Sequence, residues 1–119
     1  MELSDKELLE LAAKAAGYEA YGVSGLPSQK GGLVLYGAHD KYSWNPLEDD
    51  GDALRLAVKL ELICEYRRWA NEAFVIHHAL GRWWAERRNG TDEDATCRAM
   101  RRAITLAAAG IARPDAQQP

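Results

Sequence analysis

One stretch of thirteen residues, 44–56, constrains the fold more than any other part of the chain. It reads WNPLEDDGDALRL, so it joins a tryptophan, a turn, four carboxylates and the start of an apolar periodicity. Pro46 fixes its own φ angle and moves Asn45 away from helical geometry, which predicts a turn. A helix is expected at about 50–60, because apolar residues then recur at helical spacing. They form one wide stripe, made of Ala53, Leu54, Leu56, Ala57, Val58 and Leu60.

The carboxylates that precede this helix allow two interpretations. In the first, Asp49 or Asp50 caps the helix and Asp52 lies near the positive end of its dipole. Trp44 is then a buried anchor. In the second, residues 48–52 form an acidic loop that binds a cation or a basic partner, because carboxylates this close repel one another. Their spacing is not that of a calcium-binding EF-hand, so neither a metal ion nor another cofactor is predicted.

The N-terminal part of the chain predicts a helix and then a weak hairpin. Ser4 and Glu7 match a capping box, which begins a helix at about 5–16. Three strand-like runs follow, of which the first two are expected to pair and the third is an optional strand: 18–23, 33–36 and 41–44.

The C-terminal part predicts a long helix rich in alanine. Thr91 is the expected N-cap, and Gly110 is the expected stop signal. One face consists mostly of alanines, which would let the helix lie close to a sheet. The opposite, solvated face is expected to carry a basic cluster of Arg98, Arg101 and Arg102.

A second hairpin is predicted between the two later helices. Residues 62–66 and 73–78 are rich in β-branched and aromatic side chains, as expected of antiparallel partners. Residues 81–88 then bracket Trp83 and Trp84 with arginines. This segment is expected to be a strand or connector with one tryptophan buried and the other covering an edge. Stacking of nucleic-acid bases and a protein–protein hot spot remain alternatives.

Together these elements predict an α+β fold in the order α-β-β-α-β-β-α. A small antiparallel sheet, built from two hairpins, is expected to be covered on one face by three helices. Residues 1–112 would form a single domain, followed by a flexible tail at 113–119. The uncovered face or edge of the sheet must be charged or covered, and a homodimer that joins two sheets would cover it.

Composition argues against several classes of function. The net charge of −3 argues against a basic nucleic-acid-binding protein, so nucleic acid is a less favoured partner. No apolar run is long enough for a membrane span, and the N-terminus does not resemble a signal peptide, which indicates the cytoplasm. The two cysteines, Cys64 and Cys97, match no zinc or redox spacing.

Candidate catalytic groups are few. His39 and Asp40 lie near Ser43, but the serine lacks the sequence context of a nucleophile elbow. His77 and His78 are adjacent on a predicted strand, so their side chains should point to opposite faces and should not share one metal ion. An enzyme is therefore the less favoured class.

Two parts of the chain together resemble a group of small bacteriophage and prophage proteins. They are residues 44–56 and the alanine- and arginine-rich residues 95–110, and the likeness extends to the helix at 8–17. The group has no established activity, so the resemblance assigns no catalytic residue. It implies a phage accessory protein that acts in the cytoplasm of the bacterial host.

Three hypotheses about function follow. The leading one is a non-enzymatic protein that binds a host protein or complex and inhibits or redirects it, with counter-defence as one form. The alternatives are a small-molecule or nucleotide-binding module, and a metal-dependent hydrolase or nuclease that uses the acidic stretch. The expected contact residues of the binder are Trp44, Asp49, Asp50 and Asp52, followed by Arg98, Arg101 and Arg102.

Overall fold

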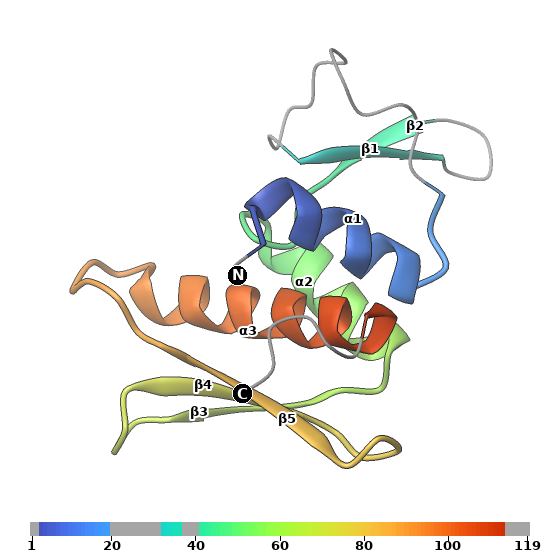
Figure 1. Ribbon diagram of the computed structural model, residues 1–119. Helices are drawn as coiled ribbons and strands as arrows, with labels where there is room; N and C mark the ends of the chain where they lie inside the picture. The colour runs from blue at the N-terminus through green and yellow to red at the C-terminus, as the bar shows by residue number, and fades with distance from the viewer. Residues whose placement is uncertain (1–2, 20–31, 37–40, 114–119) are drawn as a thin grey trace.

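The computed structural model describes residues 3–19, 32–36 and 41–113, and the described chain has an α+β fold (Figure 1). Three helices and five strands lie in these residues, in the order α-β-β-α-β-β-β-α. The α+β class is therefore confirmed, with one more strand than predicted. The elements are α1 (Asp5–Ala15), β1 (Leu33–Tyr36), β2 (Lys41–Trp44), α2 (Asp50–Lys59), β3 (Ile63–Arg67), β4 (Glu72–His77), β5 (Arg82–Arg87) and α3 (Ala95–Ala112).

Helix α3 is the central element. It lies between the β3–β4–β5 sheet on one side and helices α1 and α2 on the other (Figure 1). Its alanines permit this close packing, since Ala103, Ala107 and Ala108 are completely buried. The expected stop at Gly110 is wrong, because the helix continues to Ala112. Gly110 is a packing position: a Cβ atom there would lie 2.7 Å from the indole ring of Trp84.

The predicted N-caps of the first and last helices have different outcomes. Helix α1 has the predicted capping box, with the Glu7 amide donating to the Ser4 hydroxyl and the Ser4 amide donating to the Glu7 carboxylate. Helix α3 begins after Asp94, whose side chain makes no capping bond, so the prediction of Thr91 as N-cap is wrong. The carboxylates near this helix start bind arginines instead.

The strands form two separate antiparallel sheets rather than one. In the smaller sheet β1 pairs with β2, with Leu33 opposite Trp44. The optional strand 41–44 is the partner of residues 33–36 in this sheet, while the expected pairing of 33–36 with the run 18–23 falls mostly on residues outside those that the structure describes. Residues 20–23 of that run, His39, Asp40 and the tail from 114 lie outside the described residues.

The larger sheet has the order β3-β4-β5. Its first two strands confirm the predicted second hairpin, and the tryptophan-containing segment is its third strand rather than a connector. All three helices lie on the same side of this sheet (Figure 1). None of the described helices has the length and apolar character needed to cross a bilayer.

Helix α2 presents a narrower apolar stripe than predicted. Ala53, Leu56 and Ala57 are buried against the core. Leu54 and Val58, by contrast, are mostly exposed. The short helix packs on one side only, so a stripe that spans most of its circumference cannot be covered.

Candidate functional site

The acidic stretch is the start of helix α2, and its carboxylates bind parts of the same fold. Asp49 is the N-cap, and its side chain accepts a 2.8 Å hydrogen bond from the amide of Asp52. Asp52 is only 2% exposed. Its carboxylate accepts hydrogen bonds from the backbone amide of Asn45 at 2.9 Å and from the Arg55 guanidinium at 2.7 Å. These bonds tie the turn before α2 to the first turn of the helix.

Asp50 and Arg101 meet across the molecule, although they are 51 residues apart in the sequence. Arg101 is buried, and its guanidinium donates to Asp50 at 2.8 Å and to both carboxylate oxygens of Asp94 at 3.1 and 2.6 Å. Its Nε also donates to the carbonyl of Leu47 at 2.8 Å. The expectation of a solvated face at Arg101 is therefore wrong, because this arginine connects α3 with the start of α2.

The charges in this network stabilise one another's ionised forms. The hydrogen bond from Arg101 lowers the pKa of Asp94, and the same bond raises the pKa of Arg101. The hydrogen bond from Arg98 likewise lowers the pKa of Asp92. Such paired groups are typical of structural ion pairs as well as of functional sites.

Trp44 lies in the core and is 2% exposed. The ring of Tyr18 meets it edge to face, with the ring centroids 5.6 Å apart. Its strand partner in β1 is Leu33, which is also buried. In this conformation Trp44 and Asp52 are packing residues, and only Asp49 and Asp50 of the predicted acidic contact set reach the surface.

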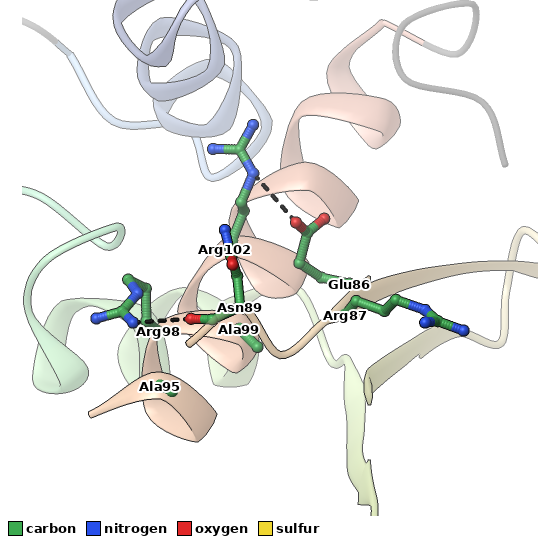
Figure 2. A pocket seen from close by; sticks show the side chains of 7 residues that line it. All are labelled: Glu86, Arg87, Asn89, Ala95, Arg98, Ala99 and Arg102. Carbon is green, nitrogen blue, oxygen red and sulfur yellow. Dashed lines mark hydrogen bonds and ion pairs between the residues drawn. The ribbon is translucent and has the colours of Figure 1, made fainter. Parts of the chain in front are cut away.

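A shallow hollow of about 180 Å³ lies where the end of β5 meets the start of α3 (Figure 2). Figure 2 shows Arg102 directed toward Glu86 and Arg98 directed toward the carbonyl of Asn89. The lining contains three arginines and one glutamate, which at first suggests an anion site. The arginines in the hollow are Arg87, Arg98 and Arg102.

Ion pairs remove the excess positive charge of this hollow. Arg98 forms a bidentate ion pair with Asp92, in which the two N–O distances are 2.9 and 3.2 Å. Arg102 lies 3.3 Å from a carboxylate oxygen of Asp5 and 3.5 Å from one of Glu86. A phosphate would have to displace these carboxylates, so the hollow does not favour an anionic ligand.

The outer face of the β3–β4–β5 sheet presents apolar side chains that no helix covers. Ala73, Val75 and Trp84 are buried and face α3, so the alternate residues along each strand face outward. The strand register places Ile63, Ile76 and Trp83 side by side in one row. Ile63 is 47% exposed and Trp83 is 48% exposed. We call these three residues the apolar row.

Phe74 lies next to the apolar row and contacts a side chain from each neighbouring strand. The ring of Trp83 stacks on it with 5.4 Å between centroids and 27° between planes. From the other neighbouring strand, the Arg67 guanidinium lies 3.6 Å from the centre of the Phe74 ring. Arg67 is also bound to Glu65 at 2.7 Å. The face is thus an ordered platform of stacked aromatic and guanidinium groups.

The described residues contain no group of three or more histidine, cysteine, aspartate or glutamate side chains that could hold a metal ion. His77 and His78 do not form a pair of ligands. The Nδ1 atom of His77 accepts a hydrogen bond from the Leu80 amide at 3.2 Å, and His78 lies in the following turn. Cys64 and Cys97 are both free.

No family model, no curated protein and no solved structure matches this chain. The candidate site therefore rests on the geometry of the chain itself. Its most distinctive feature is the uncovered face of the larger sheet. Sequence reasoning had proposed one buried and one surface tryptophan in residues 81–88, but it did not join Trp83 to Ile63 and Ile76. The period-2 alternation of β4 and β5 is the signal that could have done so.

Proposed function

We propose that this protein is a non-catalytic binding protein that docks a partner protein on the outer face of its β3–β4–β5 sheet. The observation that carries the proposal is the apolar row, in which Ile63 and Trp83 are half exposed on an otherwise ordered sheet. The resemblance to phage accessory proteins suggests that the partner belongs to the bacterial host. Inhibition of a host defence or nucleic-acid-processing complex is the form of action we favour.

The chemistry of the face suits a protein partner. Tryptophan and arginine are enriched among the residues that dominate protein–protein binding energy, and such hot spots are surrounded by contacts that exclude water. Trp83 is held in one orientation by stacking on Phe74, so little side-chain entropy is lost when a partner covers it. A flat surface of this kind offers little enclosure to a small molecule, which usually binds in a concave site.

Affinity capture from host lysate with substituted proteins tests this proposal. We expect Trp83→Ala to lose a partner that the unmodified protein retains. Leu54→Ala is the matched control, because Leu54 is also an exposed apolar residue but lies on α2. Photo-crosslinking from position 63 should label the same partner that is captured. Loss of the partner with Leu54→Ala and its retention with Trp83→Ala would place the interface on α2 and refute the proposal.

Sedimentation of the purified protein tests the competing occupant, a second copy of the chain. The proposal predicts a monomer, in which the apolar row is free for a host protein. A dimer that Trp83→Ala converts to a monomer would show instead that the sheet faces of two copies cover each other.

A further inference from the structure

Antiparallel pairing brings two separate pairs of arginines to one end of the larger sheet. Arg67 is the last residue of β3 and Arg87 the last of β5, and both flank Glu72 in the strand register. The amide of Arg88 donates a 2.8 Å hydrogen bond to the carbonyl of Asn71, in the turn that joins β3 to β4. Residues 67–69 and 87–88 therefore lie together, and we call them the basic end of the sheet.

Most of the positive charge at the basic end is not neutralised. Arg68, Arg87 and Arg88 are exposed, and across the described ranges their guanidinium groups make no ion pair or hydrogen bond. Figure 2 shows the side chain of Arg87 directed away from Arg98 and Arg102. Arg67 alone is paired, with Glu65. The four arginines outnumber the two outward carboxylates, Glu65 and Glu72.

The basic end of the sheet also contains a tryptophan. Trp69 is 81% exposed, more than any other large apolar side chain that the structure describes. The Arg67 guanidinium lies 5.8 Å from its ring centre. Packing does not explain a tryptophan in this position, because the turn places most of its surface in water. Its free ring surface can accept a planar group by stacking.

We propose that the basic end of the sheet binds single-stranded nucleic acid. Arg68, Arg87 and Arg88 would contact successive phosphates, and a base would stack on Trp69. Proteins that bind single strands combine these same two elements, a positively charged surface and aromatic platforms. A base within a duplex is not free to stack on a protruding turn residue, so single strands should be preferred.

The net charge of −3 does not oppose this interaction, because the charges are segregated. Residues 63–88 contain five arginines and three glutamates. Of these, Glu86 lines the hollow beside α3 and Arg82 donates to the carbonyl of Gly110 on α3. At physiological salt, charges separated by more than about 8 Å are strongly screened. A phosphate group at the basic end therefore interacts mainly with the local excess of arginines and only weakly with the more distant carboxylates.

Fluorescence anisotropy with a labelled oligothymidylate of about twelve nucleotides tests the inference directly. We expect Trp69→Ala to weaken binding by about fivefold to a hundredfold, the range found for loss of one stacked base. Trp69→Phe should restore most of the affinity, because it keeps an aromatic face. A triple variant with alanine at 68, 87 and 88 should reduce the salt slope by about two units, since each phosphate contact contributes about 0.7.

Controls distinguish a specific site from general attraction to negative charge. Lys59→Ala removes an exposed cation from α2 and should leave binding unchanged. Polyglutamate should compete poorly, because it has no bases. If Trp69→Ala binds as tightly as the unmodified protein, or if polyglutamate competes as well as oligothymidylate, the site is one for acidic polymers and the inference is wrong. Tighter binding of duplex than of single strand, or no binding in low salt, would also overturn it.

The test is independent of the proposed protein interface. Trp83→Ala should lose the captured partner yet retain oligothymidylate binding, while the triple arginine variant should behave in the opposite way. All substituted side chains at 68, 69, 87 and 88 are exposed, so the variants should keep their melting temperature. If either partner capture or oligothymidylate binding fails its test, the other proposal is not affected.

Discussion

Two regions of this molecule differ in whether their charged and apolar side chains have partners within the fold. Around the start of α2, charged groups satisfy one another, as in the bonds of the buried Arg101 to Asp50, Asp94 and the Leu47 carbonyl. On the outer face of the larger sheet, apolar and cationic groups remain available, as in Trp83 and Arg68. The most charged motif of the sequence thus connects elements of the fold, and the surface on which we propose that a partner binds lies elsewhere.

The difference follows from the neighbours that each region has. The α2 start lies against α3, and its two buried charged residues, Asp52 and Arg101, find partners within the fold, where a lone charge is expensive. The sheet has helices on one side only (Figure 1). Among the described residues, no helix covers its outer side chains, and a ligand or partner protein can take that place.

The largest expected effect is at Arg101. Arg101→Ala should lower the free energy of unfolding by about 3 kcal/mol, because it removes charge-assisted hydrogen bonds to Asp50 and Asp94 and leaves the Leu47 carbonyl without its donor. Urea denaturation measures this change. Arg68→Ala, at an exposed arginine, should change stability by less than about 0.5 kcal/mol. If the two substitutions lowered the free energy of unfolding equally, the proposed difference between the two regions would be contradicted.

Next in size is Gly110→Ala, which probes the covered side of the sheet. The added methyl group would meet the Trp84 ring at 2.7 Å, so we expect a loss of about 2 kcal/mol from overpacking. Cys97→Ala, at an exposed position of the same helix, should be nearly neutral. Combining Gly110→Ala with Trp84→Phe should cost less than the sum of the two single changes, since the smaller ring yields space. Simple additivity would contradict the close contact.

A smaller effect is expected on the open side. Trp83→Ala should lower the free energy of unfolding by about 1 kcal/mol, because it removes the stacking on Phe74 from a half-exposed site. Partner capture, by contrast, should be abolished. Thermal denaturation and capture from lysate, measured on the same preparation, separate these two outcomes. A large loss of stability would show that the apolar row is structural.

The smallest expected effect concerns pH. The hydrogen bond from Arg101 holds the pKa of Asp94 below its ordinary value of 3.8. The pair therefore contributes its full stability above that value and loses it as the pH falls through the lowered pKa. Asp94→Asn should flatten the decline of stability that begins as the pH falls below about 4. Glu93→Gln, at a neighbouring exposed carboxylate, should leave the decline unchanged, and an identical response of both variants would contradict the pairing.

The local signals in the sequence were sufficient for most of the secondary structure. The capping box at Ser4, the turn at Pro46 and the aspartate cap of α2 are short-range features, because their hydrogen bonds join residues only a few positions apart. β-Branched and aromatic residues likewise predicted the hairpin of β3 and β4. The pairing of β1 with β2 was not predictable in this way, since two short runs were candidates for the same partner and local propensity does not choose between them.

By itself, the sequence determined the α+β class, the three helices and the acidic start of α2, since periodicity and capping act over a few residues. Only the tertiary structure decided that Arg101 is buried against Asp50, that Trp84 faces α3 while Trp83 faces water, and that two pairs of arginines meet at one end of the larger sheet. These outcomes depend on which segments become neighbours in space. Burial and ion pairing are properties of that arrangement, because the free energy of a charge or an indole ring is set by what surrounds it.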